Sequence, residues 1–132
     1  MFSFKDIEEL IEKLNETNSQ LEKRNILAGY SNLKNILRLI YDDNITFGVT
    51  SKNIIKFMNS KKSKQTSLLN KVYTFDKILE MLAERKLTGN AALLALSNYI
   101  QKNERYKEVI FKIIDKNFKI RMGKKEVQKV FP

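Results

Sequence analysis

Apolar side chains recur every three or four residues along most of the chain, and this spacing limits what the chain can fold into. It places the apolar side chains on one face of a helix. No comparable run alternates apolar and polar residues with the period of two that marks a strand. The pattern therefore predicts an all-α protein. The series with helical spacing cover residues 4–14, 33–41, 75–82, 93–100 and 106–114.

Few residues interrupt these predicted helices, because the chain has only 4 Gly and 1 Pro among 132 residues. Polar stretches at residues 41–50 and 59–67 predict loops; the second, lysine-rich at 61–64, fits either a solubilising loop or an arm that follows a phosphate backbone. With neither an internal repeat nor a linker, residues 1–132 are expected to form one domain, a compact bundle of roughly seven or eight helices. Four residues that favour helix N-caps precede apolar series: Ser31, Ser51, Thr74 and Asn103.

The charge balance is strongly basic and uneven along the chain. Lys and Arg number 25 against 15 Asp and Glu, which gives a net charge of +10. Residues 1–22 carry two lysines and six acids, a net charge of −4, whereas residues 112–129 carry seven basic and two acidic residues, a net charge of +5. This balance favours a polyanionic partner that contacts the basic end of the chain.

Several classes of function are excluded by residues that the chain lacks. With no Cys and no His, it can form neither a disulfide nor a thiolate or imidazole metal site, and it lacks the usual Cys and His nucleophiles and bases. No apolar run is long enough for a membrane span, and no signal peptide opens the chain. We therefore expect a cytoplasmic monomer that binds no metal and contacts no membrane.

A short break, KLTGN, interrupts the helical pattern in the second half of the chain. A helix that begins here has about four unpaired N–H groups and the positive end of its dipole at that point, which favours a phosphate. Gly89 would let a ligand approach the main chain, and Thr88 or Asn90 can cap the helix or donate to a phosphate oxygen. Arg85 and Lys86 add positive charge. The same residues also fit an ordinary capped turn with two solvated cations.

A second candidate segment, NFKIRMGKKEVQKVFP, ends the chain. Lys119 and Arg121 alternate with apolar residues in a predicted short extended segment that leads to Gly123, after which a helix is expected to begin. Lys124 and Lys125 fall in the first turn of that helix, where the dipole disfavours positive charge. An external anion would offset this repulsion. The alternative interpretation is a solvated, charged terminus.

The two segments together resemble the N-terminal DNA-binding domain of ATP-dependent DNA ligases, in particular those of tailed bacteriophages. The resemblance lies in LAERKLTGNAALLALSNYI (82–100) and VIFKIIDKNFKIRMGKKEVQKVFP (109–132), with LIYDDNITFGVTSKNI (39–54) similar to the preceding stretch of the family. It implies an all-helical fold that grips duplex DNA across the minor groove opposite a nick. Such a domain contacts sugar and phosphate without reading sequence.

The resemblance also implies roles for individual residues. Thr88, Gly89 and Asn90 would hold one phosphate segment, and the residues from Lys119 to Lys125 would hold another. The chain departs from the family at one position, because an ungapped match puts Arg121 where many relatives have glycine.

Ligase chemistry needs a nucleophilic lysine in a Lys-x-Asp-Gly arrangement. The chain contains no Asp-Gly pair, since its glycines follow Ala28, Phe47, Thr88 and Met122. We therefore expect this chain not to be an enzyme by itself. By resemblance, the nucleotidyltransferase and OB domains are absent, ATP and Mg²⁺ belong to the missing catalytic domain, and Pro132 is the edge of an excised domain.

A second interpretation is a helical interaction module that docks a replication partner such as a sliding clamp. The acidic first helix or the loop at residues 41–50 would make that contact. A stand-alone enzyme is disfavoured: Glu8 and Glu12 lie one helical turn apart, but on an acidic helix surface they fit a solvated face.

Overall fold

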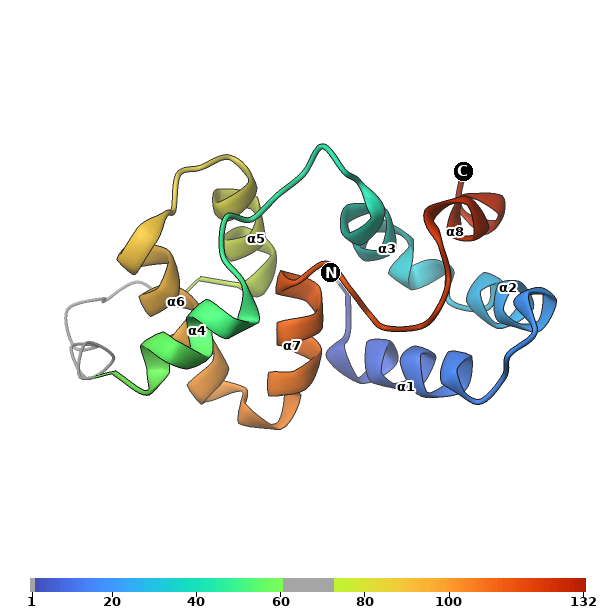
Figure 1. Cartoon of the computed structure of the whole chain (residues 1–132), viewed down its shortest axis with the longest axis horizontal. Helices are drawn as coiled ribbons and strands as arrows, with labels where there is room; N and C mark the ends of the chain where they lie inside the picture. The colour runs from blue at the N-terminus through green and yellow to red at the C-terminus, as the bar shows by residue number, and fades with distance from the viewer. Residues whose placement is uncertain (1, 61–72) are drawn as a thin grey trace. The chain divides into compact units, whose positions relative to one another are not determined.

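The computed structural model describes residues 2–60 and 73–132, and all regular secondary structure within them is helical (Figure 1). The prediction of an all-α fold with seven or eight helices is therefore confirmed for the described residues. The lysines at 61–64, predicted to form either a solubilising loop or an arm along a phosphate backbone, lie outside them. Two 3₁₀ helices, η1 (Ser31–Leu33) and η4 (Glu104–Tyr106), lead directly into α-helices. The α-helices are α1 (Phe4–Asn15), α2 (Gln20–Ala28), α3 (Lys34–Tyr41), α4 (Ser51–Met58), α5 (Phe75–Ala83), α6 (Gly89–Lys102), α7 (Lys107–Ile114) and α8 (Lys124–Val130).

Side-chain caps begin several of these helices. The predicted cap at Thr74 is confirmed, because its side chain accepts the N–H of Lys77 at 3.2 Å. The predicted cap at Ser51 is wrong by one residue, since Thr50 caps α4. The N–H and hydroxyl of Ser51 instead donate to the two carboxylate oxygens of Asp115, at 2.7 and 2.6 Å.

The predicted caps at Ser31 and Asn103 are also wrong. Ser31 lies inside η1, and Asn103 precedes η4 without a side-chain cap bond. The side-chain amide of Asn103 donates back to the carbonyl of Tyr99 at 2.9 Å. At both positions a 3₁₀ helix leads into the following α-helix, which therefore begins without a capping side chain.

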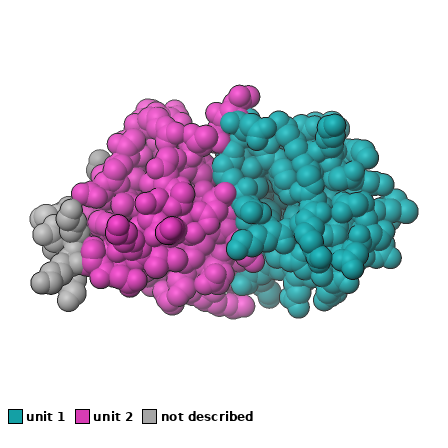
Figure 2. Space-filling model, in the orientation of Figure 1, with its two compact units in different colours: residues 1–43, 116–132 teal, residues 44–115 magenta. Residues whose placement is uncertain are grey.

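The chain divides into two compact units, shown in different colours in Figure 2. Unit 1 consists of Met1–Asp43 and Lys116–Pro132, and unit 2 consists of Asn44–Asp115. Unit 1 is thus built from both ends of the sequence. The assignment of residues 1–132 to a single DNA-binding domain stays a prediction.

In unit 1, α2 packs against both α1 and α8. Apolar residues at helical spacing bury one face of each helix, and burial of each such side chain stabilises the fold by about 1.5–3 kcal/mol. The segment between α7 and α8 adds three more buried side chains to this core: Phe118, Ile120 and Met122. The helical part of the core includes Ile7, Leu10, Leu14, Leu27, Leu33, Leu37 and Val127.

In unit 2, α6 packs against α4 and α5, and α4 also contacts α7. The rings of Phe75 and Tyr99 stack with their centroids 5.2 Å apart. Across residues 2–60 and 73–132, no helix combines the length and the apolar character needed to cross a bilayer. The buried residues of unit 2 include Phe47, Ile54, Phe57, Ile78, Leu82, Leu96, Ile100, Ile110 and Ile113.

Candidate functional site

The first predicted segment forms the turn between α5 and α6 in unit 2. The structure places all five predicted residues of this turn at the surface, and Leu87 between them is partly buried. These five residues are therefore accessible to a ligand. The exposed residues are Arg85, Lys86, Thr88, Gly89 and Asn90.

Thr88 occupies the N-cap position of α6, yet its side chain makes no capping bond. The first bond across the cap joins the N–H of Ala92 to the carbonyl of Thr88 at 3.3 Å. Within the described part of the chain, neither the hydroxyl of Thr88 nor the N–H groups of residues 89–91 have a protein acceptor. Thr50 and Thr74, by contrast, cap their helices. The start of α6 therefore has hydrogen-bond donors to offer an external acceptor.

Gly89 has a φ of +58°, in the left-handed region that favours glycine. A β-carbon built at this position would meet no atom within 4 Å. The backbone conformation therefore explains the glycine, and the space beside its α-carbon is open to a ligand.

Arg85 is tied to the loop that precedes α4 rather than free in solvent. One guanidinium nitrogen, Nη2, donates to the hydroxyl of Thr46, and the other, Nη1, lies beside the α-carbon of Gly48. The Nζ atom of Lys86 lies 3.7 Å from Oε2 of Glu84. Both side chains are exposed, and ion pairs between exposed side chains contribute little to stability. Lys86 is therefore the more accessible of the two predicted cations.

The second predicted segment lies in unit 1, between α7 and α8. Its predicted alternation is confirmed in one respect: Phe118, Ile120 and Met122 are buried, while Lys119 and Arg121 are exposed. The predicted extended backbone is wrong, because φ is +55° at Lys119 and +56° at Arg121. These left-handed residues turn the chain while the side chains still alternate between core and solvent.

Three consecutive carbonyls of this turn, those of residues 120–122, accept hydrogen bonds from side chains of α2 and α3. These donors were not predicted from the sequence. One of them, Lys23, lies four residues before Leu27 and therefore shares its buried face of α2. The bonds run from Lys23 Nζ to Ile120 O at 2.6 Å, from Gln20 Nε2 to Arg121 O at 3.2 Å and from Tyr41 Oη to Met122 O at 2.9 Å.

Gly123, Lys124 and Lys125 follow this turn and are all exposed. Gly123 is the N-cap of α8, which has only seven residues, and it makes no side-chain cap. Lys124 forms an exposed ion pair with Asp43 at 3.2 Å. The predicted start of a helix at Lys124 is confirmed.

Left-handed backbone is confined to basic residues among the non-glycine positions that the structure describes. These positions are Arg85, Lys116, Lys119 and Arg121. A residue with a β-carbon in this conformation costs about 1–2 kcal/mol, so each is held there by its surroundings. The φ of Arg121 is one that glycine adopts freely. Lys116 is not among the predicted site residues, and its ammonium donates to the carbonyl of Asp42.

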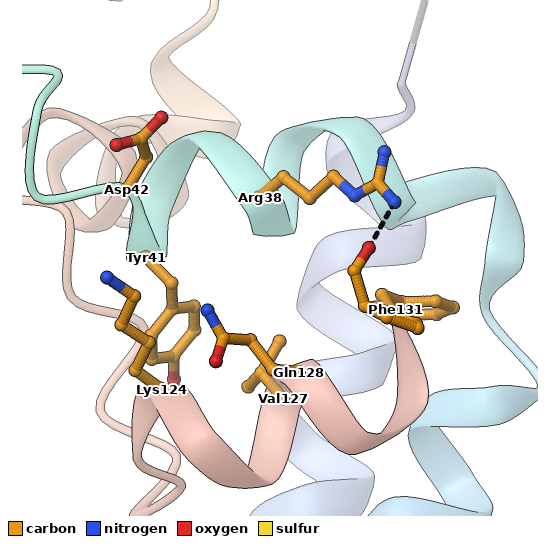
Figure 3. A pocket seen from close by; sticks show the side chains of 8 residues that line it. Arg38, Tyr41, Asp42, Lys124, Val127, Gln128 and Phe131 are labelled. Atoms are coloured by element: carbon orange, nitrogen blue, oxygen red, sulfur yellow. Dashed lines mark hydrogen bonds between the residues drawn. The ribbon is translucent and has the colours of Figure 1, made fainter.

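A cavity of about 320 Å³ lies beside Lys124, between α3 and α8 (Figure 3). Arg38 lines it and donates to the carbonyl of Pro132 at 2.5 Å. Of the predicted site residues, this cavity includes Lys124. The full lining is Arg38, Tyr41, Asp42, Lys124, Val127, Gln128, Phe131 and Pro132.

In the described ranges, no group of three or more acidic side chains is placed to hold a metal ion. Compared with known proteins, the chain matches no family model and no curated protein sequence.

Proposed function

We propose that the chain binds duplex DNA without sequence preference, as the N-terminal domain of an ATP-dependent DNA ligase that seals nicks. One observation carries the proposal. Both segments with the ligase resemblance fold as exposed turns in which basic residues hold a left-handed backbone: Arg85 in one, and Lys119 and Arg121 in the other. Non-glycine residues in the left-handed region cluster at ligand-binding sites, and this tendency supports the proposal.

The chemistry of these turns suits sugar and phosphate rather than base edges. Lysine and arginine attract the phosphate charge, and backbone N–H groups and a threonine hydroxyl donate to its oxygens. Such contacts position a protein on the duplex but carry no sequence information. The net charge of +10 adds a long-range attraction to any polyanion.

In the proposed setting this chain supplies binding and position, across the minor groove opposite the nick. Adenylation and sealing, with ATP and Mg²⁺, belong to the catalytic domain of the same ligase. The resemblance to phage enzymes places this activity in the cytoplasm of a bacterial or phage-infected cell, in replication and repair.

The proposal is tested by fluorescence anisotropy with labelled nicked duplex, intact duplex and single-stranded DNA, between roughly 50 and 200 mM salt. Two duplexes of unrelated sequence should bind equally. The logarithm of the affinity should fall with the logarithm of salt, by about 0.9 for each phosphate neutralised. Absent duplex binding, or binding that does not respond to salt, would contradict the proposal.

Matched variants sharpen this test. Lys86→Gln and Lys125→Gln each remove one charge from one of the two turns, and each should weaken binding to all duplexes alike and lower the salt slope by about 1. Lys34→Gln removes the same charge from the exposed start of α3, outside both turns, and should leave the slope nearly unchanged. A loss confined to one DNA sequence would point to base readout instead.

The other candidate function is a module that docks a replication partner such as a sliding clamp. The support for this candidate is an acidic surface on α1 and its C-cap, where Glu9, Glu12 and Glu16 are exposed at helical spacing. Retention of a purified clamp in nuclease-treated buffer, abolished by Glu12→Lys, would support it.

A further inference from the structure

Lys23 is a buried cation whose environment is unusual for a lysine. It lies on α2 with 1% of its surface exposed, and its ammonium donates to the carbonyl of Ile120 at 2.6 Å. Among the described residues no carboxylate forms an ion pair with it. Burial lowers the pKa of Lys23, and the charge of Arg121 lowers it further.

Stability alone does not explain a lysine at this position. Burying an ammonium without a carboxylate costs more solvation than one carbonyl returns, and apolar side chains often replace buried charges without loss. Methionine has a similar length and fills buried space readily. The reason for Lys23 is therefore to be found in the turn that it contacts.

The carbonyl groups of this turn accept hydrogen bonds from side chains of α2 and α3, whereas its N–H groups take no part in these bonds. The carbonyls of residues 120–122 are all taken by Lys23, Gln20 and Tyr41. Within the described part of the chain, the N–H groups of residues 120–123 donate to no protein acceptor. Carbonyl oxygens would repel a phosphate, so engaging all three removes that repulsion.

We propose that Lys23 is a positioning residue of the turn at residues 119–123, the basic turn that contains Lys119 and Arg121. Its ammonium holds the carbonyl of Ile120 and, with the two neighbouring bonds, fixes the left-handed conformation of Arg121. The guanidinium and the backbone N–H groups are then ordered before a phosphate arrives. The inference rests on the proposed function for its ligand, while the hold on the turn is independent of DNA.

The hold on the turn is tested without DNA by ¹⁵N relaxation of residues 119–123. In the wild-type protein their order parameters should be near about 0.85, and in Lys23→Met they should fall toward about 0.6. Lys34→Met, which removes the same charge from an exposed position, should leave them unchanged. Tyr41→Phe removes one bond and keeps the ring, so it tests the same network if Lys23→Met does not fold. Unchanged order parameters in both Lys23→Met and Tyr41→Phe would overturn the proposal.

The effect on binding is tested by a double-mutant cycle with a labelled 20-base-pair duplex. Lys23→Met should weaken binding about three- to tenfold, because the turn must then be ordered on binding. In the Arg121→Gln background the same change should cost less than about twofold, since the group that Lys23 positions is gone. Equal losses in both backgrounds would show that Lys23 does not act through Arg121.

The two proposals fail in different ways. If the wild-type chain binds no duplex, the proposed function fails, and a turn that loosens in Lys23→Met still supports the positioning role. If the chain binds duplex but Lys23→Met changes neither the order parameters nor the affinity, the positioning role fails alone.

Discussion

A β-carbon on Gly48 would lie 2.2 Å from Nη1 of Arg85, so the guanidinium occupies space that only a glycine leaves open. The other terminal nitrogen of Arg85 donates to the hydroxyl of Thr46. The turn after α5 and the loop before α4 are therefore joined through one arginine. This contact holds the left-handed Arg85 at the edge of the predicted phosphate-binding turn.

Gly48→Ala should destabilise the protein by roughly 1–2 kcal/mol, as measured by urea unfolding. Most of this cost comes from the φ of +73° at Gly48. The guanidinium is the far end of a flexible side chain and can move away, which also breaks its bond to Thr46. Gly123→Ala is the control, because its φ is −81° and an added β-carbon meets no atom within 4 Å. Equal destabilisation by both variants would contradict this account.

Thr88→Val should leave stability within about 0.5 kcal/mol of wild type, because the hydroxyl makes no capping bond to lose. Thr74→Val removes a cap that the structure does contain and should cost about 1 kcal/mol. If Thr88 donates to a phosphate, Thr88→Val should also weaken duplex binding about three- to tenfold. Urea unfolding and anisotropy on the same samples check both parts, and an unchanged affinity would remove Thr88 from the proposed site.

Arg121→Gly should stabilise the protein by roughly 0.5–1 kcal/mol, since relief of the left-handed strain exceeds the added freedom of the unfolded chain. Arg121→Gln keeps the strain and removes the same charge beside Lys23, so the difference between the two variants isolates the backbone. Both should weaken duplex binding. Differential scanning calorimetry and anisotropy measure the two effects, and a less stable Arg121→Gly would contradict the prediction.

The stability difference between Lys23→Met and wild type should depend on pH. Burial lowers the pKa of Lys23 from its ordinary 10.5, so the folded state loses the proton at a lower pH than the unfolded chain does. Between the two pKa values the unfolded state binds more protons, and wild-type stability gains from rising pH. Any gain in the free energy of unfolding that Lys23→Met brings over wild type should therefore be largest near neutral pH and shrink toward pH 10.5.

Urea unfolding of both proteins across this range measures the difference. Burial raises the pKa of Tyr41, but this residue is present in both proteins and its contribution cancels. A difference that stays constant or grows with pH would show that the Lys23 ammonium is not desolvated.

Helical periodicity predicted the fold class because one face of most helices is buried in a core. The spacing of Val109, Ile110 and Ile113 places all three inside α7, as expected. Helix α4 lay outside the predicted series, and so did α2, which buries only Lys23 and Leu27. Helix α2 is stabilised instead by its contacts with α1 and α8.

The exposed basic residues of both turns were predicted from local sequence, because alternation and turn composition act over a few residues. The supporting bonds were not predictable in the same way. Lys23 and Ile120 are separated by 97 residues, and Gln20 and Arg121 by 101. No local pattern pairs such positions. The left-handed φ of Arg121 was equally hidden, since arginine gives no signal for it.

The division of unit 1 between the two ends of the sequence sets an order for folding on the ribosome. All of unit 2 is contiguous, so its helices can pack once Asp115 has emerged. The bond from the Lys23 ammonium to Ile120 cannot form until Ile120 has been translated, and α2 cannot pack against α8 until α8 has been translated. Until α8 has emerged from the ribosome, the surface of α2 that packs against α8 is therefore exposed, although α2 is translated early.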